Sequence, residues 1–355
     1  MTTDLKNTRR VIIAISGGID SSVAAYLIKK QGYDCAGITM ELSGCSSITD
    51  MEDARKIAGF LDMPYYVFNF TDSFENEVIK RFAGAYIKGY TPNPCIDCNR
   101  FIKFGRLLQK AKELDYYYIA TGHYANIEYD NICGRYLLKK AVDEKKDQSY
   151  VLYSMAQEQL RHIKFPLGNL TKPEVRKIAE ERGFVNAKKK ESQDICFVQK
   201  NQNGDYADFI EKYTGRTFPE GNFVDLNGNI LGRHKGIIRY TTGQRRGLGL
   251  ALKSPMYVYD KNAGNNTVIL CGGEELYAKE LIAHDINLIP FDRIDKKIKI
   301  KAKVRYNQKE QPAAAEQTGE DTLHIEFENP QRAITKGQSV VLYDGDIVVG
   351  GGTIE

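Results

Sequence analysis

The chain has 355 residues, of which 42% are hydrophobic and 27% charged, and its formal net charge is +4. This is an ordinary globular composition with room for two or three domains, and the small net charge confines any nucleic-acid surface to a local patch. No apolar run is long enough to span a membrane and no signal peptide is recognisable, so we expect a cytoplasmic protein with no membrane partner. The 7 cysteines, an odd number, indicate free thiols or metal ligands rather than a disulfide framework.

The first predicted strand runs into a glycine turn and then into a helix. Residues 11–15 are all apolar, which is typical of a strand buried on both faces. The turn Ser16-Gly17-Gly18 follows, and residues 21–28 have a helical pattern. Free N–H groups and the helix dipole make such a helix start a phosphate site, which the glycines allow the ligand to approach. The pattern Ser-Gly-Gly-x-Asp-Ser lacks the lysine of the usual P-loop and resembles the pyrophosphatase loop of enzymes that adenylate a substrate with ATP.

Strands and helices then alternate along the first part of the chain. We expect strands at 34–40, 65–70 and 116–120, and helices at 50–62, 73–88 and 101–114, from 145 onward and from 171 onward. This alternation predicts an α/β fold with a doubly wound parallel sheet. Ligands of such sheets bind at the carboxyl ends of strands, so Ser16, Met40 and Gly122 are candidates for one nucleotide pocket, although Met40 alone also fits a core position.

Two segments far apart in the sequence carry the cysteines of interest. In the first, two prolines hold the chain extended before Cys95-x-x-Cys98, a spacing that also serves zinc, iron–sulfur and redox sites. Cys98 lies close to the predicted start of the helix at 101–114, where we expect a lowered thiol pKa and a stronger nucleophile. In the second, Cys196 has apolar neighbours, as a buried structural cysteine would, but the lysines at 188–190 favour a thiolate or a bound phosphate.

The pattern changes after the second cysteine segment. Short alternating strands with tight turns replace the helices, and Asn227-Gly228 and Asp344-Gly345 are signals for type I′ hairpins. We therefore expect three domains, which are a parallel-sheet domain at 1–203, a small linking domain at 204–280 and a β-barrel at 281–355. Within the last domain, residues 311–322 look like a polar, alanine-containing loop.

A row of cations stands out in the predicted barrel. Lys297, Lys299, Lys301, Lys303 and Arg305 alternate with other residues, so on a strand they all project from one face. Their spacing along that face, roughly 6.6 Å, is close to the distance between phosphates on one nucleic-acid strand. A solvated strand face and an RNA-facing surface both fit this pattern.

These motifs together resemble the family of tRNA-specific 2-thiouridylases over essentially the whole chain. The segments that carry the resemblance follow the order of the family, at 16–21, 91–94, 98–99, 102–104, 120–124, 146–150, 195–197, 242–245, 305–306 and 330–338. The resemblance implies ATP-dependent 2-thiolation of the wobble uridine (U34) of tRNA by a PP-loop adenylation domain, a small central domain and a C-terminal β-barrel. It also implies Mg²⁺ with the ATP and a sulfur donor such as a cysteine desulfurase or a persulfide carrier protein.

The resemblance assigns roles to residues of this chain. Cys98 would be the nucleophile and Cys196 the persulfide carrier, and the two could form a transient disulfide. The residues implied for ATP are Ala14, Ile15, Ser16, Gly17, Gly18, Ile19, Asp20, Ser21, Met40 and Gly122. Those implied for the target uridine and the rest of the tRNA are Asn93, Pro94, Cys95, His123, Lys146, Asp147, Gln148, Arg305, Tyr306 and Gln338.

The chemistry gives these assignments a reason. The C2 oxygen of uracil is a poor leaving group, and adenylation turns it into one that departs with AMP. A persulfide on Cys196 can then attack C2, with Cys98 attacking the inner sulfur to release the product. Alternatively, Cys98 first frees sulfide inside the pocket, and the sequence does not choose between the two routes.

One position departs from the family pattern, because Cys95 stands where an aspartate is common. Asp97 could take over its proton role, the role could be dispensable, or a third thiol could serve. In the last case Cys95, Cys98 and Cys196 could hold a [4Fe–4S] cluster with one open iron. Two rival functions are an ammonia-fed adenylating synthetase, which the cysteine pair disfavours, and a catalytically silent tRNA- or metal-binding protein, which the glycine turn disfavours.

Overall fold

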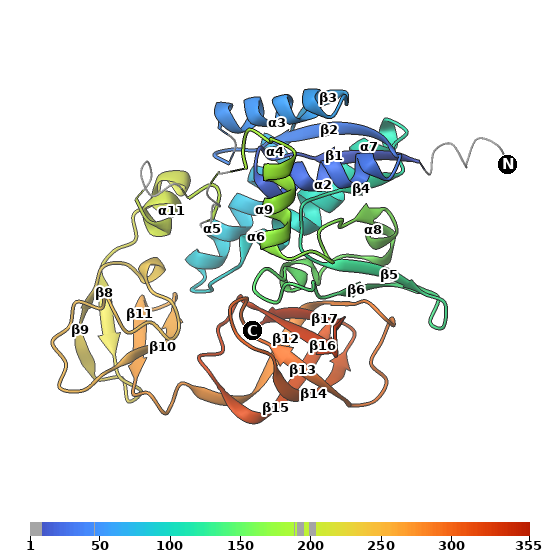
Figure 1. The fold of residues 1–355 in the computed structure, drawn as a ribbon. Coiled ribbons are helices and arrows are strands. Elements are labelled where there is room, and N and C mark those ends of the chain that lie inside the picture. Colours follow the sequence, from blue (N-terminus) through green and yellow to red (C-terminus); the bar gives the residue numbers. More distant parts are fainter. Residues whose placement is uncertain (1–8, 46, 188, 190–194, 199–203) are drawn as a thin grey trace.

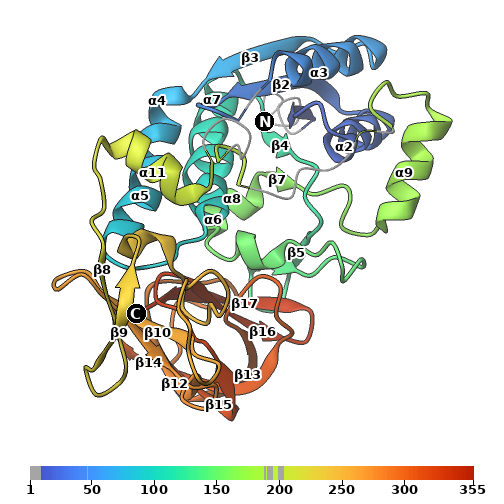
Figure 2. The same ribbon diagram turned by 90° about the vertical axis from the view of Figure 1, so that its left-hand side faces the viewer.

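The computed structural model describes residues 9–45, 47–187, 189, 195–198 and 204–355. They form a parallel sheet in the first part of the chain, a small sheet in the central part and a barrel in the C-terminal part (Figure 1). The central sheet and the barrel lie on the same side of the parallel-sheet region (Figure 2). Among the described residues, no helix is both long and apolar enough to cross a membrane.

The parallel sheet has the strand order β3-β2-β1-β4-β7 and confirms the predicted α/β fold. Its strands are β1 (Arg10–Ala14), β2 (Asp34–Glu41), β3 (Tyr65–Asn69), β4 (Tyr118–Ala120) and β7 (Ile163–Lys164). Ile12 packs in the core on one face of β1, whereas Val11 and Ile13 pack in the core on the other face. This two-sided burial explains why the first strand is an uninterrupted apolar run.

Helices cover both faces of this sheet (Figure 1). The helices α2 (Ile19–Lys30) and α3 (Ile48–Phe60) contribute to the core that contains Val11, and α7 (Leu107–Glu113) contributes to the core that contains Ile12. The other α-helices of the described residues are α4 (Thr71–Phe74), α5 (Lys80–Ile87), α6 (Pro94–Asp97), α8 (Gln157–Arg161), α9 (Lys172–Glu181) and α11 (Tyr206–Thr214).

The helix expected from residue 145 is wrong. Only a short 3-10 turn, Ser149–Leu152, forms there. The Asp147 carboxylate accepts hydrogen bonds from the backbone N–H groups of Ala141 and Ser149, which hold the preceding segment as a loop. A carboxylate that binds nearby backbone donors in this way competes with helix formation.

The helix that carries the first cysteine pair begins earlier than its pattern predicts. It starts with α6 at Pro94 and continues through a π-helical stretch, Cys98–Arg106, into α7. The Asn93 side chain accepts a hydrogen bond from the N–H of Cys95, and Pro94 occupies the first turn, both of which favour a helix start here. Cys98 therefore lies inside a helix and not at its N-terminus.

The second half of the chain is built from antiparallel and mixed strands. The central sheet has the order β10-β11-β8-β9, with β8 (Gly221–Val224), β9 (Ile230–His234), β10 (Tyr257–Asn262) and β11 (Thr267–Cys271). The barrel consists of β12 (Tyr277–Leu288), β13 (Ile298–Lys303), β14 (Gln311–Gly319), β15 (Thr322–Arg332), β16 (Ser339–Asp344) and β17 (Ile347–Ile354). An additional pairing of β12 with β17 closes it, which confirms the predicted β-barrel.

Two features cross the domain boundaries expected from the sequence. Strand β12 begins at Tyr277, so the boundary expected at 280/281 falls inside a strand. The hairpin of β5 (Asn126–Asp130) and β6 (Arg135–Lys139) belongs to the first part of the chain but extends the barrel sheet through the pairing of β6 with β17. The parallel-sheet region and the barrel are therefore joined by backbone hydrogen bonds.

Two local predictions in this half are also corrected. Residues 311–322 are not a loop, because Ala313 and Ala315 point into the barrel and alternate with more exposed residues along β14. The hairpins at 227–228 and 344–345 exist, but neither has the type I′ turn, which requires two successive residues with positive φ. Gly228 (86°) and Gly345 (60°) are positive, whereas their neighbours in the turns are not.

Candidate active site

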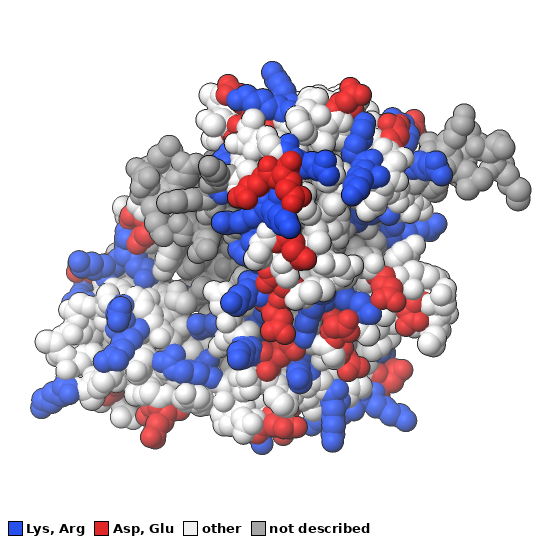
Figure 3. All heavy atoms as spheres, viewed as in Figure 1, with Lys and Arg blue, Asp and Glu red and all other residues white. Residues whose placement is uncertain are grey.

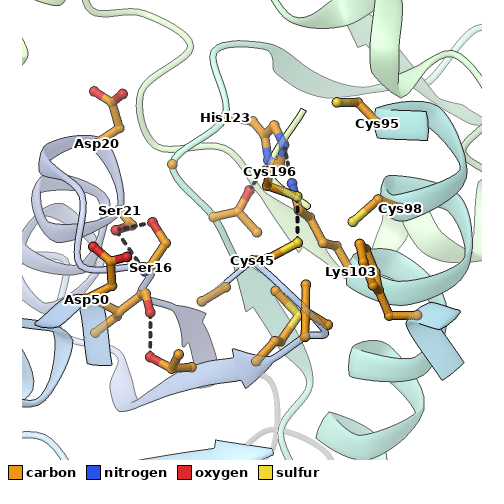
Figure 4. A pocket seen from close by; sticks show the side chains of 18 of the residues that line it. Ser16, Asp20, Ser21, Cys45, Asp50, Cys95, Cys98, Lys103, His123 and Cys196 are labelled. Atoms are coloured by element: carbon orange, nitrogen blue, oxygen red, sulfur yellow. Dashed lines mark hydrogen bonds between the residues drawn. The ribbon is translucent and has the colours of Figure 1, made fainter. Parts of the chain in front are cut away.

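A pocket of about 420 Å³ lies at the carboxyl ends of β1, β2 and β4. In Figure 4, the glycine turn and Asp50 lie on one side, and the helix bearing Cys95, Cys98 and Lys103 lies on the other. Of the residues predicted to bind ATP, those that line the pocket are Ala14, Ile15, Ser16, Asp20, Ser21, Met40 and Gly122. Ligand pockets of parallel sheets occur at this edge, as the sequence analysis assumed.

The remaining predicted ATP residues shape the turn. Gly17 has a φ of +72°, and a Cβ atom there would lie 2.3 Å from the backbone oxygen of Asp50. Gly18 caps α2, and among the described residues no side chain hydrogen-bonds that helix start as a cap. Ile19 instead packs into the core, where it is 4% exposed. The turn thus presents helix N–H groups toward the pocket, an arrangement that binds phosphate.

Hydroxyl groups reinforce the turn. The N–H of Ser16 donates to Oγ of Ser21 at 3.1 Å, and the Oγ atoms of Ser21 and Ser22 donate to the carbonyl of Gly18 at 3.0 Å each. Gly122 completes the wall, because a Cβ atom at this position would lie 2.7 Å from the backbone N of Ser21. The end of β4 therefore abuts the start of α2 directly.

Two lysines bind the acidic residues around the turn, namely Lys172 and Lys189, the second of which belongs to the predicted lysine group at 188–190. Lys172 donates to Asp20 at 2.6 Å and is itself almost buried. Lys189 donates to Asp50 at 2.7 Å and to Asp53 at 2.8 Å. Although burial opposes it, the hydrogen bonds from Lys189 and from Ser47 lower the pKa of Asp50.

Two residues upstream of Cys196, Asn186 and Lys189, form hydrogen bonds with the glycine turn and the start of α2. Nδ2 of Asn186 donates to the carbonyl of Gly17 at 3.0 Å and to Oγ of Ser22 at 2.9 Å, and Lys189 also reaches that carbonyl. Of the three lysines that the sequence analysis singled out, Lys188 and Lys190 lie outside the described residues. Asn186 and Lys189 therefore help to hold the conformation of the nucleotide turn.

Cysteines from three separate segments line the same pocket, namely Cys45, Cys95, Cys98 and Cys196. Cys95 and Cys98 come from the α6 helix region, Cys196 from the downstream segment, and Cys45 from the loop after β2. The Sγ atoms of Cys45 and Cys196 are 2.7 Å apart, and Figure 4 shows this pair between the glycine turn and the helix. No motif in the sequence marks Cys45, although its position soon after Met40, at the carboxyl end of β2, is a signal that could have identified it.

The thiols differ in their environments. Burial raises the pKa of Cys98 to about 12, against the opposing charge of Lys103, so the lowered pKa expected from a helix start is wrong. The hydrogen bond with Cys45 lowers the pKa of Cys196, and the Lys103 charge acts in the same direction while burial opposes both. Burial also raises the pKa of Cys95, although part of its side chain still contacts solvent. Cys196 is thus the thiol best suited to carry negative charge.

His123 lines the pocket as a neutral residue. Its Nδ1 lies 2.7 Å from Oγ1 of Thr121 and its Nε2 lies 3.4 Å from Nζ of Lys103. Burial first, and the Lys103 charge second, lower the pKa of His123 well below its usual value. Next to it, Oε1 of Gln148 accepts a hydrogen bond from the N–H of Tyr124. Both side chains can offer hydrogen bonds to a neutral base.

Asp97 does not replace the aspartate that the family commonly has at position 95. Its carboxylate pairs with Nε of Arg81 at 3.2 Å, and it is not among the residues that line the pocket. Burial raises its pKa, with Arg81 and Arg100 opposing. The option in which Asp97 moves protons in this site therefore loses its geometric basis.

Cys95, Cys98 and Cys196, the three residues predicted as alternative ligands of a [4Fe–4S] cluster, line the same pocket, and the cluster stays a prediction. Among the described residues, no three His, Cys, Asp or Glu side chains converge as metal ligands would. Cys196, which such a cluster would need, is already in contact with Cys45.

Several residues predicted to contact tRNA also make hydrogen bonds within the protein, and their contacts with tRNA stay predictions. Nη2 of Arg305 donates to the carbonyls of Thr242 and Ala333 and to Oγ1 of Thr335. The Tyr306 hydroxyl donates to the carbonyl of Asp147, and the Gln338 amide donates to the carbonyl of Thr91. The backbone N–H of Lys146 donates to the carbonyl of Asp143. Arg305 therefore joins the barrel to the central part of the chain.

The predicted cation row is confirmed only within β13, which contains Lys299, Lys301 and Lys303, whereas Lys297 and Arg305 lie outside the strand. Ile300 and Ala302 are buried between the exposed Lys299 and Lys301, whereas Lys297 pairs with Glu326 at 2.6 Å. On the face seen in Figure 3, basic and acidic side chains are interspersed over the parallel-sheet region. On this face, an RNA surface would consist of local groups of cations.

Comparison with known proteins covers nearly the whole chain. Residues 9–200 match the family described as tRNA methyl transferase HUP domain, residues 207–272 its PRC-barrel domain, and residues 278–354 the aminomethyltransferase β-barrel domain. The chain is 51% identical over 357 residues to the tRNA-specific 2-thiouridylase MnmA of Clostridioides difficile (strain 630), with 98% of each chain covered. It is also 51% identical over 359 residues to the tRNA-specific 2-thiouridylase MnmA of Acetivibrio thermocellus, covering 98% of this chain and 99% of the relative. The glycine turn, the thiols gathered beside it and this full-length identity show that the chain belongs to the family of tRNA-specific 2-thiouridylases.

Proposed function

We propose that this protein replaces the C2 oxygen of the wobble uridine (U34) of tRNA with sulfur at the expense of ATP. Membership of the family implies ATP and tRNA as substrates. The observation that carries the proposal is that the phosphate-binding turn, with Ser16 and Ser21, and the thiols of Cys98 and Cys196 line one pocket. An activated oxygen and an incoming sulfur must meet at the same carbon, and this pocket supports both needs.

The glycine turn would hold the phosphates of ATP at the N-terminus of α2. Mg²⁺ is usually bound by one or two carboxylates together with substrate phosphates. The carboxylates of the pocket are Asp20 and Asp50, which pair with Lys172 and Lys189 in the structure and would have to share their oxygens with the metal. The metal would neutralise charge on the departing pyrophosphate. The protein's own donors, Ser16, Ser21 and the helix N–H groups, would orient the phosphates for attack by the uridine oxygen.

Sulfur transfer would then proceed from Cys196. Its lowered pKa suits it to accept sulfane sulfur from a donor such as a cysteine desulfurase or a persulfide carrier protein. The terminal sulfur of the resulting persulfide would attack C2 as AMP departs. Neutral His123, together with Pro94, Cys95 and Gln148 of the pocket lining, would bind the uracil ring.

Replacing Cys196 with serine tests this assignment. The Cys196→Ser variant should still release pyrophosphate with tRNA and ATP but form no 2-thiouridine, whereas Cys133→Ser, a change at an exposed cysteine of the β5–β6 turn, should behave like the wild type. Nucleoside analysis of total tRNA from cells with and without the protein gives the product. Full thiolation by Cys196→Ser would remove the persulfide role, and amidated nucleoside would support the ammonia-fed synthetase instead.

A further inference from the structure

Lys103 is a cation on the cysteine side of the pocket. Among the described residues that line the pocket, the charged side chains are Asp20, Asp50 and Lys103, while His123 is neutral. The two carboxylates already pair with other lysines beside the glycine turn. Lys103 lies on the opposite side (Figure 4), and no ion pair joins it to a described residue. A half-buried ammonium group without a counterion favours an anionic ligand.

The fold fixes the position of this lysine. Lys103 follows Cys98 by five positions within the π-helical stretch Cys98–Arg106. Because the backbone hydrogen bonds of a π-helix join residues i and i+5, the two side chains lie about one turn apart on the same face, and both line the pocket. The neighbours Ile102 and Phe104 are fully buried in two different apolar clusters. Packing on both sides therefore holds this face of the helix toward the pocket.

A hydrogen bond orients the ammonium group. Nζ of Lys103 lies 3.4 Å from Nε2 of His123, and Nδ1 of His123 lies 2.7 Å from Oγ1 of Thr121. An ammonium group can only donate, so Nε2 accepts and the proton of the neutral ring is on Nδ1. Within the described part of the chain, Lys103 makes no other hydrogen bond. Two of its three N–H groups therefore remain for a ligand.

We propose that Lys103 is a catalytic residue of sulfur transfer, whose ammonium group binds the terminal sulfur anion of a persulfide on Cys196 and holds it for attack on C2 of the uridine. This inference rests on the proposed function and adds the cation of its second step. Lys103 contacts His123, which is predicted to contact the substrate, and it shares a helix with Cys98. The phosphates would be held by the glycine turn on the other side of the pocket (Figure 4).

The charge of Lys103 acts on thiols from both cysteine segments. The pKa of Cys196 is lowered first by its hydrogen bond with Cys45, while burial opposes this, and next by the charge of Lys103. Burial raises the pKa of Cys95 and of Cys98, and the same charge opposes both rises. One ammonium group therefore lies within electrostatic range of the sulfur atoms that the proposed reaction uses.

The step balances in atoms and electrons. The terminal sulfur of the persulfide donates an electron pair to C2 of the adenylated uridine and forms the C–S bond. The bond from C2 to the oxygen of AMP breaks, and its electron pair leaves with AMP. No oxidant or reductant takes part, and Lys103 keeps its protons. The uridine is then joined through the transferred sulfur to Cys196, and its release remains the step that the family resemblance gives to Cys98.

The first test needs no tRNA. Iodoacetate and iodoacetamide are similar in size, but iodoacetate is an anion, and both alkylate the thiolate of the exposed Cys196. Because the thiolate is the same, its pKa cancels in the ratio of the two rates. In the full-length Lys103→Gln protein, the ratio of the iodoacetate rate to the iodoacetamide rate at Cys196, measured by peptide mapping, should be about tenfold lower than in the wild type.

A lysine outside the pocket provides the control for this ratio. Lys110 lies farther along the same helical segment, in α7, and pairs with Glu113 at 2.9 Å. Lys110→Gln removes the same charge and should keep the wild-type ratio at Cys196. A ratio in Lys103→Gln that equals that of Lys110→Gln would overturn the proposal.

The second test separates sulfur transfer from adenylation. Protein loaded with sulfane sulfur from inorganic polysulfide is desalted and mixed with ATP and tRNA. Pyrophosphate is followed directly, and 2-thiouridine is counted per loaded sulfur after reduction with dithiothreitol, so that base still joined to Cys196 is included. Lys103→Gln should form 2-thiouridine about 100-fold more slowly than the wild type, while its pyrophosphate release stays within about threefold. Lys103→Arg keeps the charge and should thiolate within about tenfold of the wild-type rate.

The outcomes separate this proposal from the proposed function. If the wild type forms no 2-thiouridine, the proposed function fails, and the alkylation ratio still decides whether Lys103 attracts an anion to Cys196. If the wild type is active and Lys103→Gln thiolates at the same rate, only the role of Lys103 fails. Pyrophosphate release that falls as far as thiolation would assign Lys103 to the phosphates and also overturn the proposal. If thermal unfolding shows Lys103→Gln to be misfolded beside Lys110→Gln, Lys103→Met takes its place in both tests.

Discussion

Substituting Gly17 with alanine tests whether the glycine turn requires a residue without a Cβ atom at this position. Gly17 has a φ of +72°, and its Cβ would lie 2.3 Å from the backbone oxygen of Asp50. Gly32, just beyond α2, has a similar φ of +82°, but no described atom lies within 4 Å of a Cβ built there. Gly32→Ala is therefore a matched control that has the same backbone strain without the clash.

The expected magnitudes differ for the two variants. An alanine in the left-handed region costs about 1–2 kcal/mol, which lowers the Tm by roughly 2–8 °C for a domain of this size. Gly32→Ala should show that loss and keep its activity. Gly17→Ala must also displace the backbone of Asp50, whose carboxylate binds Lys189, and so should disturb the phosphate site itself. A displacement of about 1 Å in a reacting group can cost roughly 100-fold in rate.

The assay is tRNA-dependent pyrophosphate release, measured together with thermal unfolding of both variants. We expect Gly17→Ala to lose about 100-fold in pyrophosphate release while Gly32→Ala stays within about twofold of the wild type. Equal pyrophosphate release by the two variants would show that the turn tolerates a Cβ atom at position 17.

Three further outcomes are expected. Arg305→Ala removes the Nη2 group, whose two protons are shared among three acceptors at the joint between the barrel and the central part. A hydrogen bond from a charged donor is worth about 1.5–3 kcal/mol, so the Tm should fall by several degrees more than that of Lys301→Ala, an exposed change; equal Tm values would contradict this. The pKa of His123 in the folded protein is well below its usual value, so the unfolded chain binds more protons as the pH falls. The free energy of unfolding should therefore decrease below about pH 6.5. In His123→Gln, the free energy of unfolding measured between about pH 7.5 and 5.5 should lack this decrease. Iodoacetamide at pH 7 should modify Cys196 at least tenfold faster than Cys98, as peptide mapping would show, because hydrogen bonding lowers the pKa of one thiol and burial raises that of the other.

Local sequence patterns predicted much of the architecture. The apolar run at 11–15 and the glycine turn after it predicted the central strand and the phosphate site, because a doubly buried strand and a helix start both leave local signals. Predictions failed where the hydrogen bonds of a side chain, or a turn, determined the conformation of the backbone. Asp147 binds nearby N–H groups and replaces an expected helix with a loop, and Asn93 with Pro94 starts a helix before its apolar pattern begins.

The sequence by itself determined the fold class, the phosphate-binding turn and the identity of two of the cysteines that meet there, since each depends on a contiguous motif. Only the tertiary structure decided which thiols touch and which can ionise. Tertiary packing brings the loop after β2 beside the segment of Cys196, and no local pattern encodes that proximity. The charge on a thiol depends on the burial and the neighbours that packing supplies, which is why Cys98, predicted to be acidic, has its pKa raised to about 12.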